Sequence, residues 1–153
     1  MLELTHTLPV NRVNHPELSL EQLWAGLMLR VIEPTLFTVG LDRADILTQT
    51  NEQYRRALHF GEHVVHDTVT LLKHQRIEFV TDPTDSAPSG RLLIELEGDV
   101  GDALKLTFSY ATEFPEASND EERGLLEMIK SAYMAADEDT IRIIREHALT
   151  VRH

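Results

Sequence analysis

The sequence of 153 residues contains no cysteine, which excludes disulfide bonds, thiolate catalysis and cysteine-ligated zinc. It is also poor in basic residues, because 14 Lys and Arg stand against 26 Asp and Glu, and the formal net charge is -12. Such a charge repels phosphate backbones and anionic lipids. Neither nucleic acid nor a membrane surface is therefore an expected partner.

Long hydrophobic runs are absent too. No apolar segment approaches the ~20 residues that a bilayer span requires, and residues 1–10 alternate instead of forming a basic and then apolar signal segment. A cytoplasmic location is the expectation from these features. The length and the 42% apolar content suit a single domain over residues 1–153 with one sizeable core.

The hydrophobic period changes from two to about 3.6 and back along the chain. Residues 2–8 alternate and predict a first strand, and apolar positions at spacings of three and four predict a helix from Leu20, where Ser19 and Gln22 form a capping box. Residues 34–37 are expected to form a further turn. Alternation then predicts six strands in a row, separated by polar or glycine-containing turns, at 42–49, 53–60, 62–72, 75–81, 91–97 and 103–113.

One long amphipathic helix is predicted to finish the chain over residues 119–149, with Ser118 and Glu121 as its capping box. At about 1.5 Å per residue such a helix spans some 45 Å. Its apolar stripe includes Leu125, Met128, Ile129, Ala132, Tyr133, Ala136, Thr140, Ile143, Ile144 and His147. The order of elements indicates an α+β helix-grip fold, in which a curved seven-stranded antiparallel sheet wraps around the C-terminal helix. A cystatin-like cone is the alternative, although its main helix normally precedes the sheet.

The second and third of the six strands are predicted to carry a buried charge pair. A tight turn at Gly61 would place Arg56 opposite Asp67 on the more apolar face of the sheet. Burying either charge alone costs several kcal/mol, so each needs the other. Two interpretations stay open: a structural ion pair, and a polar anchor that orients a ligand in an otherwise apolar pocket.

The histidines give no metal-binding pattern. His59 and His66 are expected on the outer face of the sheet and His63 on the other face, with no third ligand at strand spacing. We interpret them as surface histidines and expect neither a metal nor another cofactor. His6, on the apolar face of the first strand, is interpreted as a core or rim histidine, with a general base as the alternative.

Acidic residues also predict little chemistry. The acidic residues in the stretches 113–122 and 137–139 are interpreted as complements to a helix dipole and as solvated surface, which leaves Asp67 as the only firm acid on the inner face. Gly-x-Ser-x-Gly and phosphate-binding loops are absent. Tyr54, Tyr110 and Tyr133 lie on the three apolar faces that are expected to converge inside the fold, where a phenol can line a cavity and offer one hydrogen bond.

Four segments carry a resemblance to a known family: THTLPVN at 5–11, LSLEQLWAGLMLRVIEP at 18–34, YRRALHFG at 54–61 and LKLTFSY at 104–110. They are similar to the SRPBCC superfamily of START and birch-pollen-allergen proteins, and within it to the AtaL-like subgroup. The resemblance covers nearly the whole chain and implies the helix-grip fold. Members of this superfamily act as ligand carriers, polyketide cyclases, ring-hydroxylase subunits or chaperone co-regulators, so fold analogy does not choose among these functions.

The sequence therefore predicts binding of a small, largely hydrophobic molecule between the sheet and the C-terminal helix. The alternatives are a cyclase-like or hydratase-like enzyme in the same cavity, with Arg56, Asp67 and a tyrosine moving a proton, and a protein-interaction module. The predicted ligand-binding residues come from the inner faces of strands and helix: Tyr54, Arg56, Leu58, Phe60, Asp67, Phe79, Phe108, Tyr110, Met128 and Tyr133.

Overall fold

The computed structural model describes residues 1–13, 15–85, 87–98 and 103–151. The element order is the predicted one, a strand and short helices followed by six strands and a long helix. The elements are β1 (Leu2–Pro9), α1 (Leu20–Ile32), a 3₁₀ turn η1 (Pro34–Leu36), β2 (Arg43–Gln49), β3 (Gln53–Phe60), β4 (His63–Leu72), β5 (Arg76–Thr81), β6 (Gly90–Glu97), β7 (Lys105–Thr112) and α2 (Asp120–Val151).

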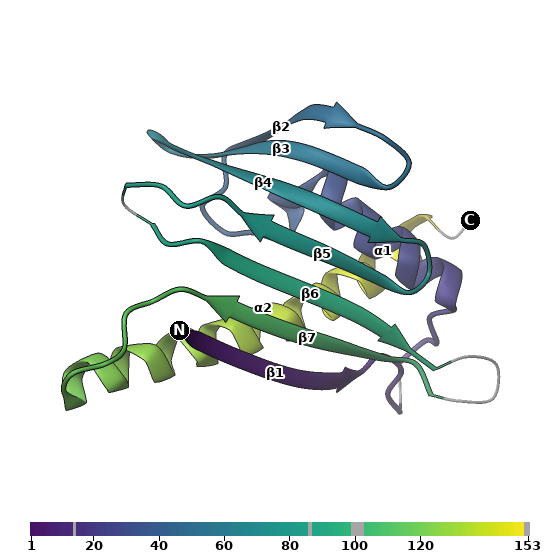
Figure 1. The fold of residues 1–153 in the computed structure, drawn as a ribbon. Coiled ribbons are helices and arrows are strands. Elements are labelled where there is room, and N and C mark those ends of the chain that lie inside the picture. Colours follow the sequence, from purple (N-terminus) through teal and green to yellow (C-terminus); the bar gives the residue numbers. More distant parts are fainter. Residues whose placement is uncertain (14, 86, 99–102, 152–153) are drawn as a thin grey trace.

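The seven strands form one antiparallel sheet in the order β1-β7-β6-β5-β4-β3-β2. Strands β2 to β7 form a meander, and β1 pairs with β7 at the far edge. Figure 1 shows both helices on the same side of the twisted sheet. The predicted α+β helix-grip fold is confirmed. In the described part of the chain, no helix combines the length and the apolar character needed to cross a bilayer.

The register of the β3–β4 hairpin is the predicted one. Phe60 pairs with His63, Leu58 with Val65 and Arg56 with Asp67. Gly61 has a φ of 59°, a left-handed conformation that favours glycine, so the turn chemistry fixes this register. Because successive residues of a strand point to opposite faces, the register decides which side chains of β3 and β4 face the helices.

The two helix N-termini differ in how closely they follow the sequence pattern. For α1 the predicted capping box is confirmed, since the Gln22 N–H donates to Ser19 Oγ at 3.1 Å and the Ser19 N–H donates to Gln22 Oε1 at 2.9 Å. For α2 the predicted box is wrong by one residue. Asn119 Oδ1 accepts the N–H of Glu122 at 2.8 Å, and the Glu122 carboxylate reaches back to the N–H of Ser118.

The core lies between the sheet and the two helices, and its largest fully buried side chains include Leu23, Leu27, Ile77, Ile94, Leu106, Phe108 and Ile144. The helices approach each other closely at Gly26. A Cβ added there would lie 2.4 Å from Cγ2 of Ile144. This glycine is therefore required by packing.

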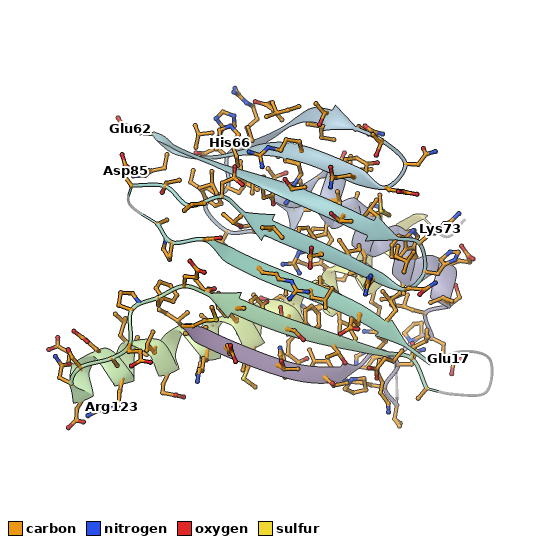
Figure 2. All side chains as sticks on the ribbon, viewed as in Figure 1. Glu17, Glu62, His66, Lys73, Asp85 and Arg123 are labelled. Carbon is orange, nitrogen blue, oxygen red and sulfur yellow. The ribbon has the colours of Figure 1, made fainter. Side chains whose placement is uncertain are left out.

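The first turns of α2 extend beyond the edge of the sheet (Figure 1), and Arg123, labelled in Figure 2, lies on this projecting end. Here the predicted apolar stripe is wrong, because Leu125 and Met128 are exposed, Met128 by 70%. The reason is length. The 32 residues of α2 span about 48 Å, whereas the 10 residues of β4 span about 34 Å.

Candidate functional site

A pocket of about 380 Å³ lies between the inner face of the sheet, the end of α1 and the middle of α2. Strands β3 to β7 all contribute to it, and the loop before β6 adds Ala87 and Pro88. The apolar part of the lining includes Pro34, Leu41, Leu58, Phe60, Phe79, Leu92, Tyr110, Phe114 and Tyr133. Hollows of about 650 and 520 Å³ on the outside of α2 are lined mainly by charged and polar residues instead.

Aromatic rings and guanidinium groups form the walls of this pocket. Tyr110 from β7 stacks on Tyr133 from α2, with ring centroids 4.3 Å apart and planes 6° apart. Two guanidinium groups lie over the ring of Phe79, that of Arg56 at 5.4 Å and that of Arg30 at 5.7 Å from its centroid. Cation–π contacts of this kind stabilise positive charge in a partly desolvated site.

Arg56 and Asp67 form a buried bidentate ion pair, and they are 3% and 2% exposed. Arg56 Nε donates to Asp67 Oδ1 at 2.9 Å and Nη2 donates to Oδ2 at 2.5 Å. Its Nη1 donates to the carbonyl oxygens of Val31 at 2.9 Å and Arg30 at 3.4 Å. These carbonyls belong to the last turn of α1, which has no intrahelical donors for them. Arg56 therefore caps α1 and ties it to the sheet.

Arg30, at the C-terminal end of α1, is the less engaged of the two arginines. Its side chain is half-buried and its Nη1 donates to Thr140 Oγ1 at 2.9 Å. It forms no salt bridge with any residue of the described ranges. Burial lowers the pKa of Arg30, nearby Arg56 lowers it further, and Tyr110 and Asp137 oppose this change. The guanidinium still keeps its proton, because its ordinary pKa of 12.5 is so high.

Asp137 lies next to the pocket and is fully buried, with 0% of its surface exposed. Tyr110 Oη donates to its Oδ1 at 2.5 Å, and His6 Nε2 lies 2.5 Å from its Oδ2. Burial raises the pKa of Asp137, and the hydrogen bonds from Tyr110 and His6 oppose that change. Burial and the adjacent Asp137 also raise the pKa of Tyr110. The interpretation of Asp137 as solvated surface is thus wrong, although Glu138 and Asp139 are exposed.

The predicted ligand-binding residues fall in three places. The structure brings together Arg56, Leu58, Phe60, Asp67, Phe79, Tyr110 and Tyr133 around the pocket. Tyr54 and Phe108 lie on the expected face but are packed in the core, and neither lines the pocket. Met128 lies outside it, on the projecting end of α2, where it lines a surface hollow.

Sequence reasoning missed Arg30 and Asp137, although a signal for Asp137 existed. It lies four residues after Tyr133 and three before Thr140, so helical spacing places it on the buried stripe. Because Glu138 and Asp139 follow directly, Asp137 was interpreted as part of an acidic surface run. His6 was correctly expected at the core or rim, where it stacks on Phe108 with ring centroids 5.6 Å apart. Its partner Asp137 is 131 residues away in the sequence, so a local sequence pattern cannot predict their contact.

The other histidines lie outside the pocket. His59 Nε2 is 2.9 Å from Asp45 Oδ2 and 3.3 Å from Arg43 Nη2, on the opposite face of the sheet. His59 and His66 are half-buried, not solvated as expected. Within the ranges that the structure describes, no three His, Asp or Glu side chains are grouped so that they could hold a metal ion.

Comparison with known proteins agrees with this architecture. Residues 4–150 match the family described as "Acetylaranotin biosynthesis cluster protein L" (AtaL). No curated protein sequence matches the chain. Among solved structures, the Zhui aromatase/cyclase from Streptomyces sp. R1128 is similar with a TM-score of 0.61 and 17% identity, over 95% of this chain and 92% of that one.

Two further solved structures share the fold. The di-domain ARO/CYC StfQ from the steffimycin biosynthetic pathway has a TM-score of 0.70 and 7% identity, over 97% of this chain and 51% of StfQ, so the chain spans about half of that protein. Ara h 8.0201 has a TM-score of 0.59 and 9% identity, over 97% of each chain. At these identities the likeness concerns the fold alone.

Proposed function

We propose that this chain, which belongs to the AtaL family, binds a small, mostly apolar molecule in the pocket between the sheet and α2, with residues 1–153 acting as one ligand-binding domain. The observation that carries the proposal is the pocket itself. Its volume of about 380 Å³ and its aromatic and aliphatic lining are typical of small-molecule sites, which combine apolar walls with a few convergent polar groups.

Arg30 is the group that we assign to the polar part of the ligand. Arg56 already donates to a carboxylate and two helix carbonyls, so little of its hydrogen-bonding capacity remains. Arg30 lines the pocket and has only neutral side-chain partners among the described residues, Thr140 and the hydroxyl of Tyr110. A partly desolvated guanidinium of this kind favours an electron-rich oxygen. The expected ligand is therefore an aromatic or polycyclic molecule that carries a carbonyl, carboxylate or phenolate oxygen.

The two alternatives receive different support. A protein-interaction module needs no internal space, so a pocket with apolar walls and two arginines favours a ligand over that function. A cyclase-like enzyme is the second candidate, and the hydrogen-bonded chain Tyr110–Asp137–His6 next to the pocket favours it. Similarity to aromatase/cyclases, such as Zhui, adds a fold-level analogy and no assignment of chemistry.

The proposal is tested with 1-anilinonaphthalene-8-sulfonate, a fluorescent aromatic anion. Leu92 points into the pocket, whereas Leu93 next to it on β6 lies on the opposite face. Leu92→Trp should fill the pocket and weaken binding by at least about 10-fold, or about 1.4 kcal/mol. Leu93→Trp is the matched control and should bind as the parent does. Equal affinities for the parent and both variants would show that the probe does not use the pocket.

The role of Arg30 is tested with the same probe. Arg30→Met removes a charge-assisted hydrogen bond worth about 1.5–3 kcal/mol, so the affinity for the sulfonate should fall about 10-fold or more. Arg43→Met, on the edge strand β2, removes an equal charge from the face of the sheet opposite the pocket and should leave the affinity unchanged. Equal losses in both variants would mean that only net charge matters and that Arg30 is not the anchor.

A further inference from the structure

Three titratable side chains form a continuous hydrogen-bonded chain from the pocket towards the surface. Tyr110 lines the pocket, Asp137 accepts its hydroxyl proton at 2.5 Å, and His6 Nε2 lies 2.5 Å from the other carboxylate oxygen. The three residues come from β7, α2 and β1. The His6 side chain is 12% exposed, whereas Asp137 is inaccessible. The chain therefore joins a ligand site to solvent through a buried carboxylate.

Packing alone does not account for this arrangement. A buried carboxylate is costly unless it is paired, and replacement of such a network by apolar residues of similar size is often neutral or stabilising. Both oxygens of Asp137 are used, and the positive charge of Arg30 lies close enough to affect its ionisation. A structural network of this kind has no need to end at a pocket wall, yet Tyr110 lines the pocket.

We propose that Tyr110, Asp137 and His6 form a proton relay that enolises a ketone bound in the pocket. The inference rests on the proposed ligand-binding function and adds a reaction to it. The α C–H bond of the ketone breaks and its proton moves to Tyr110 Oη, while the proton of Tyr110 moves to Asp137 Oδ1. The electron pair of the broken bond becomes part of the enolate, whose oxygen is stabilised by the guanidinium of Arg30.

The reverse transfer returns a proton to carbon, so no oxidant, reductant or further reactant is needed. Burial raises the pKa of Asp137, which makes this carboxylate a better proton acceptor than a solvated one. Burial and the negative charge of Asp137 raise the pKa of Tyr110, whereas the nearby positive charge of Arg30 lowers it, so Arg30 assists the transfer of the Tyr110 proton to Asp137. His6 is a positioning residue, because its N–H orients the carboxylate from the other side.

The test uses 2-tetralone, a bicyclic ketone with acidic α-hydrogens, in D₂O. Enolisation exchanges these hydrogens for deuterium, and proton NMR follows the loss of their signals. Exchange should be faster with the parent protein than in buffer. Tyr110→Phe and Asp137→Asn should each slow the protein-catalysed exchange by about 100-fold or more, as expected for loss of a general base. Asp139→Asn, an exposed acid on the same helix, is the control and should exchange like the parent.

Binding is measured separately, by displacement of 1-anilinonaphthalene-8-sulfonate by the ketone. Binding of 2-tetralone without any faster exchange would overturn the relay and leave the proposed ligand-binding function standing. Failure of the ketone to displace the bound sulfonate would overturn the relay alone, whereas failure of the sulfonate itself to bind in the pocket would overturn the ligand-binding function as well. Exchange that persists in Tyr110→Phe and in Asp137→Asn would show that another base acts, and would also overturn the relay.

A structural role for His6 is distinguished by rescue. His6→Leu removes the N–H that orients Asp137, so kcat for exchange should fall while KM for the ketone stays unchanged. His6→Gln restores an N–H donor and should recover part of kcat. His66→Gln, on the opposite face of the sheet, is the control for loss of a histidine. Equal kcat in the parent, His6→Leu and His6→Gln would overturn the assignment of His6 to the relay.

Discussion

Replacing Asp67 alone is expected to destabilise the protein more than replacing Asp67 and Arg56 together. The two side chains are 2% and 3% exposed and share two hydrogen bonds, so neither finds water when its partner is removed. Asp67→Leu leaves an unpaired guanidinium in the core, at a cost of about 3–5 kcal/mol. Domains of this size are stable by only about 5–15 kcal/mol. The single variant should therefore lose a large part of its stability.

The double variant Arg56→Met/Asp67→Leu removes both charges and recovers most of that loss. Its remaining defect is the capping of α1, because the carbonyl of Val31 loses the donor that lies at 2.9 Å in the parent. A buried carbonyl without a partner costs about 1–3 kcal/mol. We therefore expect the double variant to be more stable than Asp67→Leu by about 2 kcal/mol.

Urea denaturation followed by the fluorescence of Trp24, the single tryptophan, measures these differences. Trp24 is 7% exposed and belongs to the core, so its emission should change on unfolding. A double variant less stable than Asp67→Leu would refute the reasoning, since the two losses would then add instead of cancelling. Binding of 1-anilinonaphthalene-8-sulfonate to the folded double variant also decides between the two interpretations of the pair: unchanged affinity means a structural pair, and lost affinity means a ligand anchor.

Two further predictions concern close packing and buried charge. Gly26→Ala places a Cβ 2.4 Å from Ile144, so α1 and α2 must separate and the free energy of unfolding should fall by about 1–3 kcal/mol. In Gly124→Ala the added Cβ meets nothing within 4 Å, so the free energy of unfolding should instead rise by up to about 1 kcal/mol. Equal stability of the two variants in urea would contradict the close contact at Gly26. Because burial raises the pKa of Asp137 above 3.8 in the folded state, the stabilising effect of its protonation is present at low pH and is lost as the pH rises through the raised pKa. The stability of the parent relative to Asp137→Asn should therefore decrease as the pH rises above about 4. An increase with pH would show that the hydrogen bonds from its partners outweigh burial.

The parts of the fold that were predictable depend on local patterns. Alternation placed all seven strands within one or two residues of their observed bounds, and the glycine turn fixed the pairing of Arg56 with Asp67. This pairing could be predicted from the sequence because the two residues are 11 apart in a single hairpin. The contact of Arg56 with the carbonyl of Val31 could not be predicted, since it depends on how α1 packs on the sheet.

The features that the sequence did not predict depend on how far α2 extends beyond the sheet and on where it crosses the strands. A helical stripe indicates which residues share a face, but not which of them have a partner in space. Met128 and Tyr133 belong to the same predicted stripe, yet only Tyr133 lies over the sheet and lines the pocket. Asp137 continues that stripe and becomes buried because His6 and Tyr110 meet it from two strands that pair with each other.

The register of α2 therefore determines both the pocket and the chemistry proposed for it. Along one face of this helix, Tyr133 lines the pocket, Asp137 accepts two hydrogen bonds, Thr140 accepts one from Arg30, and Ile144 packs against Gly26. These four positions span about 16 Å of helix. A shift by one residue would rotate the helix by about 100° and would separate Asp137 from its partners on β1 and β7. The tight contact at Gly26 opposes such a rotation, so the packed end of α2 holds the relay in place for the pocket.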